Sequence, residues 1–392
     1  MRARWITASV VLSLLLLVTP GVLHAQSQAP GPIVVGWMAP LTGPLAGLGE
    51  FYTAGAQLAF EGVGYQVAGR QLRWIQEDSE AKPDVGLTKA RKLIERDRVH
   101  MLLGVISTSV ALAIRQYVLD KGTPWIATEA SGSVFEPVPG ANIFRVSPDE
   151  RGYMHPDALR HILKRGYKRL IMVGMDYSAG KDYVNSFTKK FGENGGQVVQ
   201  TVLAPLGVPD YGPYLPQLRL DQADAVLGFV WGADANRFVR QFSEFGLKGK
   251  IPLLMLGPGV EDGVALPAQG ETALGIINWY DYAVDNPIPE NRRFVEGFQK
   301  KTGKLPSMHA SKGYRTAQVA IEAIKAVGGA VEDLPRFLDA IRRVKFVSPS
   351  GPFSFDERQN AITNLYIREV RRVDGRIQNV TLDVIPGVKT PY

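Results

Sequence analysis

The chain contains no cysteine among its 392 residues. This absence excludes disulfides, thiolate metal sites, a cysteine nucleophile and a lipid carried on a cysteine after a leader peptide. Histidine is also scarce, and His155 and His161, six residues apart on one expected helix, face different sides. G-x-S-x-G, P-loop and H-E-x-x-H patterns are missing as well. We therefore expect no catalytic activity, no metal ion and no cofactor.

Runs of one charge are also absent, although 45 Lys and Arg outnumber 38 Asp and Glu. Basic and acidic residues alternate, as in TKARKLIERDR at 88–98, which is typical of a solvated helix face and argues against a nucleic-acid partner. The 41 Gly and 26 Pro follow no period, so they indicate many short connections. With 45% hydrophobic residues, a chain of this length can bury a large core, and two domains are expected.

The N-terminus has the features of a signal peptide. Arg2 and Arg4 precede an apolar run at Val10–Val18 that is too short for a stable membrane anchor, and Ala25 offers a small residue for cleavage. Leu23 is bulky for its place before the cleavage point, so the exact site and the alternative of an uncleaved anchor stay open. Without a lipid anchor, a secreted protein is retained by an outer membrane, so we predict residues 1–25 as signal peptide and the periplasm as the location.

Two series of strands and helices follow one another. Short apolar, β-branched runs alternate with amphipathic segments, as in parallel βαβ units. The first series has expected strands at 33–37, 71–76, 99–106, 125–128 and 143–146. The second has expected strands at 169–174, 198–203, 225–230 and 253–256, with helices at 182–193 and 235–245.

The last third of the chain indicates that one lobe is interrupted by the other. A strand at 276–282 leads to helices at 290–301, 311–327 and 334–342, and then to a hairpin-like end with a turn at Asp374-Gly375. We predict an α/β fold of two Rossmann-like lobes joined by three crossover segments, at 145–149, 278–281 and 347–352. Lobe 1 comprises 33–147 plus 278–348, and lobe 2 comprises 148–277 plus 349–385.

A glycine-rich turn follows the first strand and opens a helix, where free N–H groups and the helix dipole favour an anion. Gly47 and Gly49 also begin a dinucleotide fingerprint, with Glu77 and Asp78 where a ribose-binding acid would lie. Tyr52 occupies the position of the third glycine, which weakens this alternative. A periplasmic dinucleotide-dependent oxidoreductase remains the competing hypothesis.

Small polar residues also follow two neighbouring strands. Ser107, Thr108 and Ser109 precede an apolar helix, so they are expected helix N-caps that can also contact a ligand. The next strand ends in ATEASGS at 127–133. The carboxyl ends of parallel strands meet at one edge, which is where such folds bind carboxylates.

At these residues the chain resembles the leucine/isoleucine/valine-binding proteins, a family of periplasmic type I solute receptors for ABC importers. The resemblance covers essentially the whole mature chain. It rests on VGWMAPLTGPLAGLGE, EDSEAKPDVGLTKARKLIERDRVHMLLGVISTSVALAI, DYSAGKDYVNSF, FVWGADANRFVRQFSEFGLKGKIP and SPSGPFSFDERQN. It implies the type I periplasmic binding protein fold, closure of two lobes around a small ligand, and an inner-membrane ABC permease as partner. We also expect a monomer.

The resemblance also implies site residues in lobe 1. The family's carboxylate-binding serine falls on Ser107, and its small residue with a free backbone group falls on Ala130. The family's next hydroxyl residue falls on Gly132, which has no hydroxyl, with Ser131 and Ser133 beside it. Which of these two serines contacts the ligand is left open. Backbone N–H groups near Thr108 would help to hold the anion.

In lobe 2 the family's aromatic wall residue falls on Trp231, and its tyrosine before a helix glycine falls on Ala179, with Tyr177 close by.

Two departures from the family bear on the ligand. The N-terminal tyrosine of amino-acid-binding members falls on Leu48, and the acid that pairs with the α-ammonium falls on Gly259. A buried ammonium without a partner is costly, so an aromatic or aliphatic organic acid is favoured over an amino acid. Glu261 could replace the missing acid if its loop shifts, which keeps an amino acid open. A ligand-sensing receptor domain is a further alternative, because sensing uses the same lobes.

Overall fold

The structure is a computed structural model, and it describes residue 1 and residues 31–43, 45–130, 138–148 and 150–390. The predicted signal peptide lies outside these residues, apart from Met1. Residues 32–392 form one compact unit. No helix within the described ranges is both long enough and apolar enough to cross a lipid bilayer.

The first lobe is built on a six-stranded sheet in the order β2-β3-β1-β4-β5-β6, parallel except for the β2–β3 pair. Its central strand, IVVGWMA, is buried at every position, as expected for a parallel sheet that is covered on both faces. Helices α1 and α10 pack on one face, and α2 and α3 pack on the other. The elements are β1 (Ile33–Ala39), α1 (Ala46–Glu61), β2 (Gln66–Val67), β3 (Arg70–Asp78), α2 (Pro83–Arg91), η1 (Lys92–Arg96), β4 (Met101–Gly104), α3 (Thr108–Lys121), β5 (Trp125–Ala127), β6 (Ile143–Arg145), α10 (Met308–Ala326) and α11 (Leu334–Arg342).

The second lobe is built on a nine-stranded sheet in the order β12-β13-β14-β11-β10-β9-β7-β8, with β15 paired to β14. Strands β8, β7, β9, β10 and β11 run parallel, and the remaining pairs are antiparallel. Alternate residues of β7 contact α5 and α6 on one face and α7 on the other. The elements are α4 (Glu150–Tyr153), α5 (Pro156–Lys164), β7 (Arg169–Asp176), α6 (Ser178–Glu193), β8 (Gln197–Pro205), η2 (Leu215–Gln217), η3 (Leu220–Gln222), β9 (Ala225–Phe229), α7 (Gly232–Glu244), β10 (Leu253–Leu256), η4 (Pro258–Val260), α8 (Leu266–Gln269), η5 (Gly270–Ala273), β11 (Ile277–Tyr280), β14 (Ala361–Val373) and β15 (Arg376–Val388). Helix α9 (Pro289–Thr302) packs against α1 of the first lobe, and the strands β12 (Lys345–Ser348) and β13 (Gly351–Phe355) extend the nine-stranded sheet to the first-lobe core.

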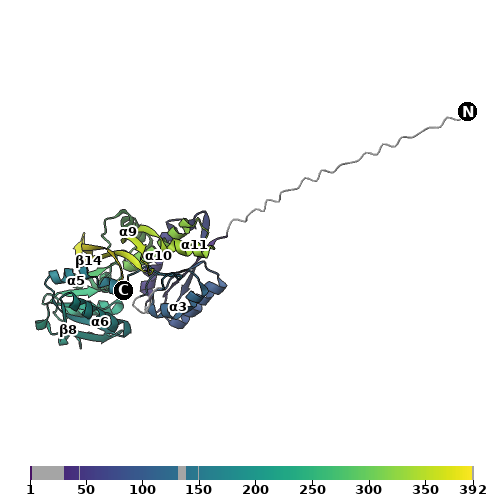
Figure 1. Cartoon of the computed structure of the whole chain (residues 1–392). Coiled ribbons are helices and arrows are strands. Elements are labelled where there is room, and N and C mark those ends of the chain that lie inside the picture. Colours follow the sequence, from purple (N-terminus) through teal and green to yellow (C-terminus); the bar gives the residue numbers. More distant parts are fainter. Residues whose placement is uncertain (2–30, 44, 131–137, 149, 391–392) are drawn as a thin grey trace. The chain divides into compact units, whose positions relative to one another are not determined.

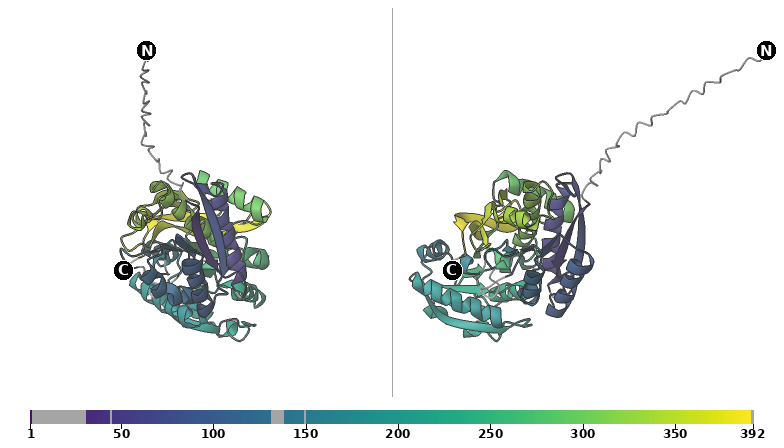
Figure 2. Two further views of the ribbon diagram at one scale, coloured as in Figure 1. Left: turned by 90° about the vertical axis from the view of Figure 1, so that its right-hand side faces the viewer. Right: turned by 45° about the vertical axis from the view of Figure 1, so that its right-hand side comes forward.

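The predicted α/β fold of two lobes is confirmed. Figure 1 shows α3 of the first lobe, in blue, and α6 and β8 of the second, in teal. Figure 2 turns the molecule so that the purple strands of the first lobe and the teal elements of the second are seen on different sides. The expected final hairpin is present, and its turn residues Asp374 and Gly375 have φ values of 48° and 79°, as a type I′ turn requires.

The chain passes between the lobes three times. The first passage leads from β6 to α4, and the second leads from β11 toward α9. The third lies in β14, because Ala361 packs with the core of the first lobe while Leu365 packs with Trp279 in the core of the second. The sequence placed this passage earlier, at 347–352, where the structure has the β12–β13 hairpin.

Helices α1 and α10 approach each other so closely that their backbones touch. A Cβ added at Gly55 would lie 2.0 Å from the carbonyl oxygen of Ala310, and one added at Gly313 would lie 1.9 Å from that of Tyr52. Only glycine allows this approach. It brings Tyr52 of α1 close to the polar residues at the start of α10.

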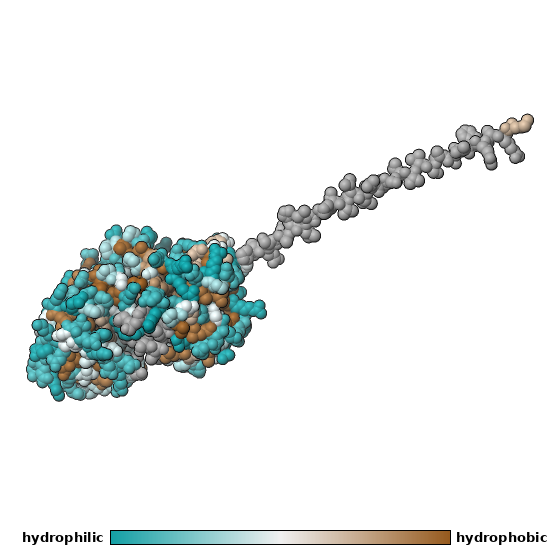
Figure 3. Space-filling view, viewed as in Figure 1, coloured by the Kyte–Doolittle hydropathy of each residue, from teal (hydrophilic) through white to brown (hydrophobic). Residues whose placement is uncertain are grey.

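The surface in Figure 3 is mostly hydrophilic, and its apolar residues are scattered or in small groups. This is the ordinary surface of a protein that faces water.

Candidate ligand-binding site

The predicted site residues follow the carboxyl ends of parallel strands in both lobes. This is the edge at which open α/β sheets bind ligands. In the first lobe Leu48 follows β1, Ser107 and Thr108 follow β4, and Ala130 follows β5; in the second lobe Tyr177 follows β7, Trp231 follows β9, and Gly259 and Glu261 follow β10.

Ser107 occupies the N-cap position of α3, but its side chain makes no capping hydrogen bond. Its hydroxyl lies instead 2.9 Å from the hydroxyl of Ser109, in an exposed position. The expected capping role is therefore not realised in this structure. A hydroxyl beside the N-terminus of a 14-residue helix is suited to bind an anion. The helix dipole and the first backbone N–H groups, from Thr108 onward, attract the same negative charge.

Ala130 is fully buried, and its backbone is fixed by a buried arginine. The Nη1 atom of Arg145 donates to the Ala130 carbonyl at 3.1 Å, and its Nε donates to Asn360 Oδ1 at 2.8 Å. This bond holds the end of β5 against the last strand of the first sheet. Ser131, Gly132 and Ser133 lie outside the described residues.

The second lobe contributes an aromatic wall. The rings of Tyr177 and Trp231 meet edge to face, with centroids 5.6 Å apart, and Trp231 also contacts Phe229 at 4.8 Å. Both Tyr177 and Trp231 are half-buried, and burial raises the pKa of the Tyr177 phenol well above its usual value. The side chain of Ala179 lies outside the described residues. In the first lobe, Leu48 is half-buried against the core that lies under α1.

An aromatic row continues from this wall toward the first lobe. Phe229 stacks on Tyr183 with ring centroids 3.7 Å apart, and Tyr280 stacks on Tyr153 at 4.1 Å. All four rings belong to one core cluster, with Trp231 packed against it. Burial raises the pKa of Tyr280, and the nearby groups Glu129 and Tyr183 raise it further. Tyr153, Tyr183 and Tyr280 were not predicted, because a buried tyrosine has no local sequence signal.

A buried lysine lies at the first-lobe end of the aromatic row. The Lys312 ammonium is 2.6 Å from Glu129 Oε2, 3.1 Å from the Tyr153 hydroxyl and 3.7 Å from Asp281 Oδ1. It also lies 4.7 Å from the ring centroid of Tyr280, which is cation–π distance. The side chain of Lys312 is only 1% exposed, so these contacts replace its hydration.

Arg315, one turn further along α10, completes the charge cluster. Its Nη2 atom lies 2.5 Å from Asp281 Oδ2, and its Nη1 donates to Thr363 Oγ1 at 3.2 Å. Burial opposes ionisation of Asp281, but the charges of Lys312 and Arg315 outweigh it and hold the pKa of this carboxyl below its usual value. We call the group of Glu129, Tyr153, Asp281, Lys312, Arg315 and Thr363 the hinge cluster.

The hinge cluster reaches every passage between the lobes. Tyr153 stands in α4 just after the first passage, Asp281 at the second and Thr363 in the third. The two cations of α10 contact all three. A single helix therefore ties together the segments that must bend when such lobes move.

The two positions considered for an ammonium partner offer no accessible carboxylate. A Cβ added at Gly259 would lie 2.4 Å from the Val230 carbonyl oxygen and 2.4 Å from Met255 Cε, so no side chain fits there without movement of the backbone. Glu261 is fully buried; its Oε1 pairs with Arg368 Nη2 at 2.5 Å, and its Oε2 accepts from the Met308 amide at 3.0 Å. Both oxygens of Glu261 are thus engaged.

The acids of the dinucleotide hypothesis are engaged as well. Asp78 accepts hydrogen bonds from the Leu41 amide at 2.8 Å and the Thr42 hydroxyl at 2.6 Å. Glu77 pairs with Lys89 at 2.8 Å and with Lys92. Among the described residues, no group of His, Asp and Glu side chains has the arrangement of a metal site.

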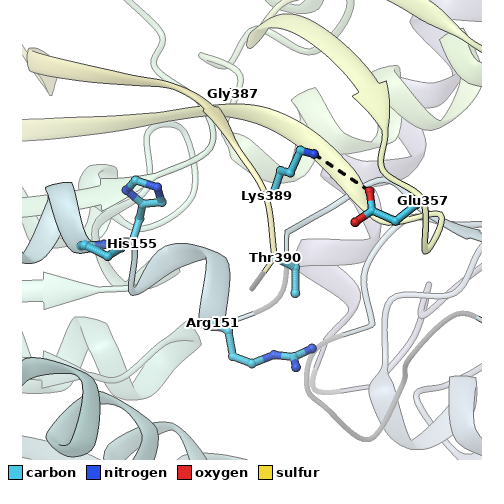
Figure 4. A pocket seen from close by; sticks show the side chains of 7 residues that line it. Arg151, His155, Glu357, Gly387, Lys389 and Thr390 are labelled. Atoms are coloured by element: carbon cyan, nitrogen blue, oxygen red, sulfur yellow. Dashed lines mark ion pairs between the residues drawn. The ribbon is translucent and has the colours of Figure 1, made fainter. Parts of the chain in front are cut away.

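A separate open hollow of about 480 Å³ lies near the end of β15. Figure 4 shows Lys389 pointing toward Glu357, at 4.0 Å, with Arg151 and His155 on other sides of the hollow. It contains none of the predicted ligand residues. The lining is Arg151, His155, Pro156, Glu357, Gly387, Lys389 and Thr390.

Residues 32–376 match the family described as periplasmic binding protein, and the chain belongs to this family. The family is one of binding proteins and not of enzymes. The resemblance to leucine/isoleucine/valine-binding proteins is confirmed: the Leu/Ile/Val-binding protein homolog 6 of Brucella abortus (strain 2308) is 31% identical over 381 residues, covering 94% of this chain and 96% of the relative.

Two solved structures share the fold. The ABC transporter substrate-binding protein from Sphaerobacter thermophilus is 36% identical with a TM-score of 0.86, covering 92% of this chain and 99% of that one. A solute binding protein of an ABC transporter from Rhodopseudomonas palustris BisB5, in complex with 3,4-dihydroxy benzoic acid, is 30% identical with a TM-score of 0.83 and the same coverage. These likenesses agree with the predicted type I periplasmic binding protein fold.

Proposed function

We propose that this protein is the periplasmic solute-binding component of an ABC importer and that its ligand is an aromatic carboxylate. The lobes close over the ligand, and an inner-membrane permease reads the closed form of the monomer. The family and the relatives that are described as parts of ABC transporters support this partner and this location.

The single observation that carries the choice of ligand is an anion site combined with an aromatic surface, while neither Gly259 nor Glu261 offers an available carboxylate. Ser107 presents an uncapped hydroxyl at the N-terminus of α3. The second lobe contributes apolar groups instead, because Tyr177 and Trp231 present half-buried rings at its strand ends. A flat apolar ring with one carboxylate satisfies both surfaces.

The state of Gly259 and Glu261 argues against an α-amino acid. An enclosed ammonium needs a carboxylate, because a buried charge without a partner costs several kcal/mol. Gly259 cannot hold one, and Glu261 is occupied by Arg368. The relative from Rhodopseudomonas palustris, bound to an aromatic acid that lacks an ammonium, supports the same choice.

Calorimetric titration of the mature protein with benzoate, a short aliphatic acid and leucine tests the proposal. We expect benzoate to bind at least about tenfold tighter than leucine, a difference of about 1.4 kcal/mol. Trp231→Ala should weaken benzoate binding while an exposed-site control, Phe245→Ala, should not. Leucine binding tighter than benzoate, or no effect of Trp231→Ala, would contradict the proposal.

A further inference from the structure

Glu129 is the member of the hinge cluster that reaches the surface. Its side chain is 16% exposed, whereas that of Lys312 is 1% exposed and that of Asp281 is fully buried. It stands directly before Ala130, at the carboxyl end of β5. Glu129 therefore lies on the edge that carries the candidate anion site, and the rest of the cluster supports it from beneath.

Within the described part of the chain, the hydrogen bonds to the Glu129 carboxylate all go to one of its two oxygens. Oε2 accepts from the Tyr52 hydroxyl at 2.8 Å and from Lys312 at 2.6 Å. Oε1 accepts no hydrogen bond from any residue in the described ranges. The two donors on Oε2 hold the carboxylate in one orientation, and an ionised carboxylate retains acceptor capacity on its second oxygen.

The charges around Glu129 favour a neutral donor over a cation. Lys312 and Arg315 supply two positive charges, which balance the two negative charges of Glu129 and Asp281. A ligand ammonium would add a third positive charge beside Lys312, and like charges at short range in a partly buried site repel strongly. A hydroxyl group adds no charge and donates one hydrogen bond.

We propose that Glu129 Oε1 accepts a hydrogen bond from a hydroxyl group on the ligand, so that the protein selects hydroxylated aromatic carboxylates over unsubstituted ones. This inference rests on the proposed function and adds a second polar contact to the Ser107 anion site. Sites that hydrogen-bond a ligand hydroxyl reject the analogue that lacks it, because a polar group of the protein then loses its partner.

The test compares benzoate with 2-, 3- and 4-hydroxybenzoate by calorimetric titration, in the wild-type protein and in Glu129→Gln. In the variant, the amide oxygen will face Tyr52 and Lys312, so an NH2 group replaces the acceptor Oε1. We expect at least one hydroxybenzoate to bind wild type about tenfold or more tighter than benzoate. We expect this ratio to fall at least about fivefold in Glu129→Gln, while benzoate affinity changes less.

Two further variants keep the test decisive. Tyr52→Phe removes a donor to Oε2 but leaves Oε1 in place, so it should preserve the hydroxybenzoate to benzoate ratio. If Glu129→Gln does not fold, the double variant Glu129→Gln/Lys312→Met replaces it. This variant removes both charges of the Glu129–Lys312 ion pair, so neither partner is left buried without the other. Suppose that benzoate binds. A ratio of hydroxybenzoate to benzoate affinity near one in wild type, or a ratio that does not change when Glu129 is replaced, would then overturn the inference and leave the proposed function standing. Failure of all aromatic acids to bind would overturn the proposed function and the inference with it.

Discussion

Arg315 and Asp281 form an ion pair in which neither side chain is exposed, with Arg315 Nη2 2.5 Å from Asp281 Oδ2. The pair joins α10 to the second passage between the lobes. Arg315 also donates to Thr363 in the third passage, so its loss affects two connections at once.

Arg315→Met is expected to lower the free energy of unfolding by about 3 to 5 kcal/mol, because a buried carboxylate loses its closest partner. Urea denaturation of the unliganded protein measures this change. The matched control is Lys325→Met, on the exposed face of the same helix, whose pair with Glu322 should contribute less than about 1 kcal/mol. Equal effects of the two substitutions would contradict the structural role of Arg315.

Ser107→Ala is expected to weaken binding of an aromatic carboxylate by about 1.5 to 3 kcal/mol, the range of a hydrogen bond to a charged group. Melting of the unliganded protein should hardly change, because the hydroxyl makes no cap to α3. Titration and thermal melting measure the two quantities. Ser109→Ala, which removes only the neighbouring hydroxyl, is the control. A stability loss larger than the affinity loss would identify Ser107 as structural.

Glu261→Gln is expected to act on stability and not on ligand preference. Its carboxylate pairs with Arg368, which is itself fully buried, so the substitution should cost about 3 to 5 kcal/mol of unfolding free energy. The preference for benzoate over leucine should stay the same when both are titrated against the variant. If wild type binds leucine tightly and Glu261→Gln loses that binding, Glu261 is the ammonium partner and the aromatic-acid assignment is wrong.

Protonation of His309 should make the protein sensitive to acid. Burial, and then the charge of Lys312, lower the pKa of this histidine from 6.5 to about 3. The unfolded chain therefore binds the proton more readily than the folded protein, and stability is lost as pH falls from 6.5 toward 3. The full difference is about 4 to 5 kcal/mol at 1.36 kcal/mol per pKa unit. His309→Gln should remove this contribution from a stability profile measured by urea denaturation.

Asp262 has the opposite effect in an overlapping range and must be separated from His309. Burial and the neighbouring charge of Glu261 raise its pKa from 3.8 to about 7, so the folded protein holds this proton more tightly and stability falls as pH rises from about 4 to 7. Asp262→Asn should therefore show a profile that rises with pH, whereas His309→Gln should show one that falls. His155→Gln is the control at a less buried site: burial lowers the pKa of His155 as well, and its removal should change the profile less than removal of His309. Parallel profiles for the Asp262 and His309 variants would refute both assignments.

The features that were predictable from sequence are local. Strands of the parallel sheets are continuous apolar runs, and the small or aromatic residues after them, such as Ser107 and Trp231, mark the strand ends. The hinge cluster has no such signal. Lys312 and Glu129 are 183 positions apart, and Arg368 and Glu261 are 107 apart, so no window of sequence shows that these charges are paired. For the same reason the sequence suggested Glu261 as a possible partner for a ligand ammonium, although its carboxylate is paired with Arg368.

The third passage was misplaced for a related reason. The segment at 347–352 contains serines, prolines and a glycine, which is also the composition of a tight hairpin turn. The structure forms such a turn there, between β12 and β13. The strand that crosses is β14, AITNLYIREVRRV, whose mixture of apolar and polar residues is that of an ordinary half-buried strand. Composition cannot distinguish a strand that stays in one lobe from a strand that serves both.

The contact between Lys312 and Glu129 has an evolutionary consequence. The same ammonium that orients the surface carboxylate also contacts Tyr153 and Asp281, so a substitution of Glu129 alters the segments that bend as well as the groups that face a ligand. Under the proposed contact between Glu129 and a ligand hydroxyl, a lineage that acquires a new ligand through this position is expected to change the balance between open and closed forms in the same step. Descendants that keep the old balance must then carry a compensating substitution on α10, and the two positions are expected to change together.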